Sequence, residues 1–178
     1  MRRLLTAFAV AICMLTGGAG QQPARSDIEG WREIAWPFPR DGWPAGRAFR
    51  CITESCGGEM EVYVRPKIGF CNCDSGVADD DEVDRVTDLD LMSQHFVPLE
   101  PGQVIRIADM PGRLRSYDLQ MSDGSRHTAV GIAVSHRCDL LVAVAQGKGE
   151  ASGVQRVALD FLATDAVTRW MTAAMNGR

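Results

Sequence analysis

The chain opens with Arg2 and Arg3, which precede a largely apolar run over residues 4–15 and the small residues 17–20. A charged start, an apolar middle and a small-residue end are typical of a secretory signal peptide, here residues 1–20, with cleavage predicted after Gly20. The run is too short to span a bilayer, which takes about 20 residues. We therefore expect export to the periplasm or secretion, with no membrane insertion after cleavage. This destination constrains the fold, because cysteines pair in oxidising compartments.

The charge of the chain argues against two classes of partner. The formal net charge is -4, and acidic side chains gather between Asp74 and Asp90, where only Arg85 opposes them. Nucleic acids and anionic membranes both attract basic surfaces, so neither is an expected partner. After cleavage roughly 160 residues remain, which is the usual size of a single domain.

Residues 21–46 form a segment rich in tryptophan and proline ahead of the main domain, residues 47–178. Trp31, Trp36 and Trp43 are interspersed with prolines. Proline fixes φ and has no amide donor, which excludes a regular helix or an interior strand. We expect an extended arm, whose indoles either cover part of the domain or form a ledge for a partner.

In most of the remaining chain, apolar and polar residues alternate over short segments, which predicts strands. Residues 67–73 are also expected to be extended. Two capping-box spacings, Asp79 with Glu82 and Ser152 with Gln155, predict helix starts. Helical periodicity follows each start, over residues 79–93 and from 152 to about 175, with a possible break at Thr164. The predicted strands are residues 47–53, 59–65, 103–107, 113–121, 127–135 and 140–146.

The order of the predicted elements indicates an α+β fold. Strands grouped around one helix are followed by more strands and a terminal helix. Helices do not alternate with strands as a parallel sheet requires, so we expect an antiparallel sheet of six to seven strands with a helix on each face. This order of elements resembles the Mog1/PsbP-like architecture. The resemblance implies a fold and no activity.

Five cysteines follow the predicted cleavage site: Cys51, Cys56, Cys71, Cys73 and Cys138. An odd number leaves at least one thiol unpaired, and sequence alone does not fix the connectivity. The first four lie close together in sequence, so we expect both disulfides among them, linking the predicted hairpin to the Cys71–Cys73 segment. Cys138 would then be the free thiol.

A metal site is the first alternative for these cysteines. Cys71 and Cys73 share one side of the predicted extended segment, and His136 and Cys138 lie at a predicted turn. Thiolate and imidazole ligands suit copper, so these four residues are the candidate ligands. A second alternative is thiol–disulfide exchange through a small Cys71–Cys73 ring.

Two further patterns give weaker indications. The run from Ser135 to Cys138 is similar to the Ser-His-Gly-Cys run of L,D-transpeptidases, but Arg137 replaces the glycine and a turn explains the same letters. The acidic run suggests calcium, yet no EF-hand register fits it. His95 and His127 are isolated, and no acid pair or glycine loop indicates catalysis.

The sequence therefore favours an exported, disulfide-braced accessory or binding protein that is not an enzyme and holds no resident cofactor. We expect it to contact a protein partner in the periplasm through the arm and the acidic segment. A copper binding or delivery factor is the alternative, and a thiol–disulfide oxidoreductase is the third hypothesis. The candidate contact residues are Trp31, Trp36, Trp43, Asp79, Asp80 and Asp81.

Overall fold

The structure is a computed structural model, and it describes residues 28, 30–39 and 41–176. The predicted signal peptide, residues 1–20, lies outside this part of the chain, as does the start of the predicted arm. In the described residues, no helix is long and apolar enough to cross a membrane.

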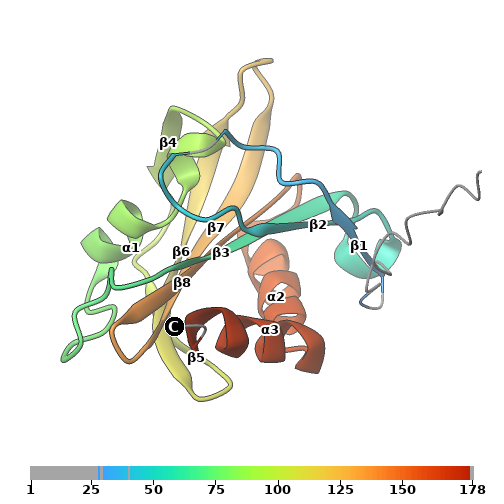
Figure 1. The fold of residues 1–178 in the computed structure, drawn as a ribbon. Coiled ribbons are helices and arrows are strands. Elements are labelled where there is room, and N and C mark those ends of the chain that lie inside the picture. The colour runs from blue at the N-terminus through green and yellow to red at the C-terminus, as the bar shows by residue number, and fades with distance from the viewer. Residues whose placement is uncertain (1–27, 29, 40, 177–178) are drawn as a thin grey trace, which may run out of the picture.

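One antiparallel sheet of eight strands forms the centre of the fold (Figure 1). The strand order is β1-β2-β3-β8-β7-β6-β4, and β5 also pairs with β6. The long neighbouring strands β6, β7 and β8 carry most of the pairing: β7 and β8 contain apolar runs, and β6 alternates apolar with polar residues. The strands are β1 (Trp31–Ile34), β2 (Arg47–Cys51), β3 (Met60–Lys67), β4 (His95–Pro98), β5 (Gln103–Ile107), β6 (Met110–Gln120), β7 (Arg126–His136) and β8 (Asp139–Gly147).

Helices cover both faces of this sheet, which confirms the predicted α+β architecture. Alternate strand residues point to opposite faces. Ile132 and Val62 therefore join the core under α2 (Ala151–Leu162) and α3 (Asp165–Asn176), whereas Ala133 and Val142 pack against α1 (Asp80–Val86). Figure 1 shows α1 on one side of the sheet and the α2–α3 pair on the other.

The first predicted helix begins where expected and ends early. The Asp79 carboxylate accepts from the backbone N–H of Glu82 at 2.9 Å, as its capping role requires. The prediction of a helix to residue 93 is wrong, because α1 stops at Val86 and only a short 3-10 turn, η2 (Leu89–Leu91), follows. The Thr87 hydroxyl donates to the carbonyl of Val83, and Asp88 turns inward, so the chain leaves the helical path.

The second predicted helix start is misplaced by a few residues. The N-cap of α2 is Glu150, without a side-chain cap, so Ser152 lies inside the helix. The break near Thr164 is confirmed, because α2 ends at Leu162 and α3 starts at Asp165.

Two strands, β1 and β4, were not predicted, so the sheet has eight strands where about six to seven were expected. β1 lies in the arm, where prolines follow it and where an edge position tolerates them. β4 has only four residues and ends in Pro98. The expectation that residues 67–73 stay extended is also wrong, because β3 ends at Lys67 and Gly69 takes a left-handed φ of 70° that turns the chain.

Candidate functional site

The tryptophan-proline arm is held on the domain by its aromatic rings. Trp31 is 6% exposed and lies 4.5 Å from the ring of Phe161, between the centroids, so it belongs to the core beneath α2. After β1 the arm crosses the opposite face of the sheet. There Trp36 packs edge-on against Tyr63, and Trp43 packs against Phe70. All three indoles therefore contact the domain, as expected if the arm covers part of it.

A buried guanidinium fixes the arm to the sheet and to the end of α1. Arg65, on β3, is 2% exposed. It donates to Asp88 at 2.5 and 2.7 Å and to Asp41, in the arm, at 2.9 and 2.6 Å. The Arg65 guanidinium lowers the pKa of Asp41 to about 2. Burial alone would lower the pKa of Arg65, but the hydrogen bonds from its two carboxylate partners raise it.

Most of the acidic segment makes contacts within the domain. Asp79 caps α1. The carboxylate of Asp80 accepts from the backbone N–H of Gly102 at 2.8 Å and from Arg113, and these two interactions lower its pKa. Among the three acids predicted to meet a partner, only Asp81 is exposed with no contact described for its side chain.

Two further aspartates of the acidic segment, Asp84 and Asp88, also make contacts within the domain. Asp84 accepts from Arg115 at 2.7 Å and from Tyr117 at 2.5 Å, and burial together with Asp84 raises the pKa of Tyr117. Asp88 accepts from Lys67 as well as from Arg65. Asp88 follows the end of α1, whereas Asp80 and Asp84 lie four residues apart within the helix and therefore share one of its faces. That face points toward the sheet.

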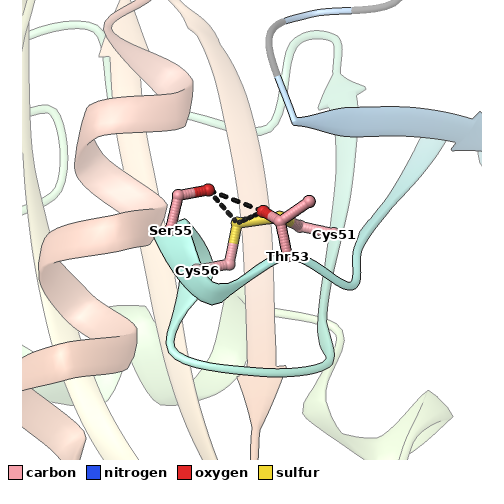
Figure 2. The surroundings of a disulfide bond; sticks show 4 residues. All are labelled: Cys51, Thr53, Ser55 and Cys56. Atoms are coloured by element: carbon pink, nitrogen blue, oxygen red, sulfur yellow. Dashed lines mark hydrogen bonds between the residues drawn. A yellow bond between two sulfur atoms is a disulfide. The ribbon is translucent and has the colours of Figure 1, made fainter.

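One disulfide closes the connection between β2 and β3. Cys51 and Cys56 are bonded, and both were predicted to take part in disulfides. Figure 2 shows the bond beside the hydroxyls of Thr53 and Ser55, which lie 2.6 Å apart. The bond fixes the short 3-10 turn η1 (Glu54–Cys56) and hence the shape of this end of the sheet.

The second disulfide joins Cys73 to Cys138 and leaves Cys71 as the free thiol. The expectation that both bonds lie among the first four cysteines, with Cys138 unpaired, is therefore wrong. The cause is strand order: β3 pairs with β8, with Lys67 opposite Leu140, so the β7–β8 turn lies beside the chain that leaves β3. Arg137 forms that turn with a positive φ of 58°.

The three cysteines Cys71, Cys73 and Cys138 form a corner of the molecule, which we term the cysteine corner. The backbone N–H of Cys71 donates to the carbonyl of Cys138 at 3.2 Å. Burial raises the pKa of the Cys71 thiol, and the negative charges of Glu82 and Asp139 raise it further. The nearby Ser135 hydroxyl acts in the opposite direction.

The predicted copper ligands are only partly assembled. Cys71, Cys73 and Cys138 come together, but two of their sulfurs are engaged in the disulfide. His136 is half-buried at the end of β7. Across the described ranges, no three histidine, cysteine or acidic residues are arranged to hold a metal ion.

A polar row across four strands was missed by sequence reasoning. Gln146 donates to Glu61 at 2.9 Å, and its amide oxygen faces Nδ1 of His127 at 3.3 Å. Burial opposes ionisation of Glu61, yet hydrogen bonds from Tyr63, Arg50 and Gln146 lower its pKa. The row borders a groove of about 450 Å³ beside Gly57 and Gly58. Because these residues are far apart in sequence, no local spacing indicates the row.

The outer edge of the sheet carries exposed apolar side chains that the sequence analysis did not single out. Val97 on β4 is 63% exposed, Leu99 just after it is 49% exposed, and Val104 on β5 is 76% exposed. Both strands pair with β6 on one side only. In the part of the chain that the structure describes, no strand pairs with their outer sides.

Comparison with known proteins assigns no family to this chain. No family model matches it, and no curated protein matches it. Among solved structures, the protein of unknown function PA94 from Pseudomonas aeruginosa is similar with 14% identity and a TM-score of 0.38, over 80% of this chain and 86% of that one. A likeness this distant transfers no function, and the α+β assignment rests on the strands and helices themselves.

Proposed function

We propose that this chain is an exported, disulfide-braced accessory protein that binds another polypeptide along the β4–β5 edge and catalyses no reaction. The observation that carries the proposal is the exposure of Val97, Leu99 and Val104 on this edge. Two disulfides are compatible with an exported protein, since such bonds persist in oxidising compartments such as the periplasm.

Backbone chemistry favours a polypeptide as the partner. An edge strand leaves every other N–H and C=O group without a partner on its outer side, and an extended peptide can pair with them. Pro98 and Pro101 lack amide donors, so pairing along β4 is restricted. β5, with five residues and no proline, is the better acceptor, and Val104 gives it an exposed apolar contact.

Three of the six contact residues predicted from the sequence are engaged elsewhere, which supports this choice. Trp31 lies in the core, Asp79 caps α1, and Asp80 is paired with Arg113. If these side chains bound a partner instead, their contacts within the domain would be lost. The valines of the edge are exposed, so a partner that covers them removes apolar surface from water, which favours association.

Site-specific photo-cross-linking in the periplasm tests the proposal. A photoreactive residue at Val104 or Val97 should give a discrete adduct with one protein, whereas the same residue at Ala173, exposed on α3, should not. The substitution Val104→Glu should abolish the adduct formed from position 97, and Ala173→Glu should leave it unchanged. Absence of any adduct from both valines, or equal adducts from all three positions, would overturn the proposal.

Copper handling at the cysteine corner is the second candidate function. The observation in its favour is that Cys71, Cys73 and Cys138 lie together, and three thiolates suit Cu(I). Binding would require prior reduction of the Cys73–Cys138 bond. Reduced protein should bind one Cu(I) tightly, and the double substitution of His136 and Cys138 by alanine should lose it while keeping the polypeptide partner. Reduced protein that binds no Cu(I) would eliminate this candidate.

A further inference from the structure

Cys138 is bonded to Cys73 through its side chain and hydrogen-bonded to Cys71 through its backbone. Its bond to Cys73 has a Cα–Cα distance of 4.4 Å. The 3.2 Å contact from the Cys71 N–H to the Cys138 carbonyl limits the Cα atoms of these two residues to at most about 7 Å apart, given standard backbone bond lengths. Disulfides form at Cα separations of about 4.4–6.8 Å, so Cys71 is a possible alternative partner of Cys138.

We propose that the cysteine corner is a disulfide switch, in which Cys71 and Cys73 exchange as the partner of Cys138. The Cys71 thiolate attacks Sγ of Cys138, a Cys71–Cys138 bond forms and the Cys73–Cys138 bond breaks. Cys73 departs as a thiolate and takes up a proton, equivalent to the one that Cys71 lost. The exchange needs no external oxidant or reductant, because one disulfide and one thiol are present before and after.

The exchange moves the free thiol from a protected position to an exposed one. Cys71 is half-buried and packs against the cluster that contains Val77 and Val83 under α1. Cys73 belongs to an exposed stretch, in which the Asn72 side chain accepts from the backbone N–H of Asp74. After exchange, the thiol of Cys73 faces solvent and can react with disulfides of other molecules. The switch thus exposes a reactive thiol without a change in overall oxidation state.

The decisive experiment maps disulfides in the substitution Cys73→Ser, with Cys71→Ser as the matched control. The Cys73→Ser protein should contain a Cys71–Cys138 bond and no thiol that iodoacetamide alkylates under native conditions. In the Cys71→Ser protein, Cys138 should be bonded to Cys73 alone, as in the structure. If Cys71 and Cys138 are both alkylated in folded Cys73→Ser protein, the proposal is wrong.

The unaltered protein provides a second test that does not depend on the folding of a variant. After equilibration with catalytic reduced glutathione and quenching in acid, peptide fragmentation should locate Cys138 bonded to Cys71 in one population and to Cys73 in another. A single Cys73–Cys138 isomer after full equilibration would overturn the switch. The cross-linking results at the β4–β5 edge are independent of either outcome.

Discussion

Arg65 and Asp88 form a two-point contact in the interior, with Nε and Nη2 of the arginine donating at 2.5 and 2.7 Å to the two carboxylate oxygens. The pair links β3 to the chain just after α1, and Arg65 also reaches Asp41 in the arm. One buried guanidinium therefore joins three segments that are distant in sequence. Its contact with Asp41 acts together with the packing of Trp36 on Tyr63 to position the arm over β3.

Replacement of Asp88 should destabilise the domain strongly. Asp88→Ala leaves the buried cations Arg65 and Lys67 without their shared carboxylate, and breaking a buried pair costs about 3–5 kcal/mol. We expect about 3 kcal/mol, because Asp41 still neutralises Arg65. Urea unfolding followed by circular dichroism measures the change. Asp90→Ala, at an exposed neighbour, should stay within about 0.5 kcal/mol. Equal effects of the two substitutions would contradict this account.

Acid should weaken the contact between Asp41 of the arm and Arg65. The pKa of Asp41 falls from its ordinary 3.8 to about 2 in the folded protein. Its contact with Arg65 therefore stabilises fully above about pH 4 and is lost as the pH falls toward 2. Asp41→Asn should lower the Tm relative to the unaltered protein at pH 6, and this difference should shrink at pH 3. Tryptophan fluorescence during heating reports it. A difference that is unchanged between the two pH values would show that the charge of Asp41 is irrelevant.

Sequence reasoning recovered elements whose signals are local. Alternation around Val62 and Val64 predicts β3, and the spacing of Asp79 and Glu82 predicts the start of α1. The end of α1 was missed because it depends on Asp88 reaching a distant guanidinium on β3. β1 was missed for a similar reason: only the pairing of Trp31 with Cys51 on β2 makes that segment a strand.

The candidate site was less predictable than the fold. The partner of Cys138 depends on β8 lying next to β3, and no local pattern reports that adjacency. The sequence analysis predicted that the acidic side chains around α1 form a free surface. The sequence does not show that Arg113 and Arg115 lie opposite Asp80 and Asp84. Exposure of Val104 likewise follows from its edge position, which is a property of strand order.

Two indoles of the arm, Trp31 and Trp43, should differ in their contribution to stability. Trp31 is buried against Phe161, so Trp31→Ala should cost about 3–5 kcal/mol, in line with other large-to-small core substitutions. Trp43 is only half-buried, and Trp43→Ala should cost less than half as much. Chemical denaturation of the two variants makes the comparison. A larger effect at Trp43 would mean that the arm, rather than the core beneath α2, governs the stability of this region.

The two disulfides should contribute unequally, because they close loops of very different length. In the chain-entropy view, a sequence separation of 65 for Cys73–Cys138 gives about 4 kcal/mol, and a separation of 5 for Cys51–Cys56 gives about 2 kcal/mol. Cys138→Ser should therefore lower the free energy of unfolding about twice as much as the double substitution of Cys51 and Cys56 by serine.

Cys73→Ser should cost clearly less than Cys138→Ser, since Cys71 can replace Cys73 as the partner of Cys138. Guanidinium unfolding of the three variants under oxidising conditions measures these differences. Equal losses for Cys73→Ser and Cys138→Ser would mean that Cys71 forms no stabilising bond, and would count against the switch.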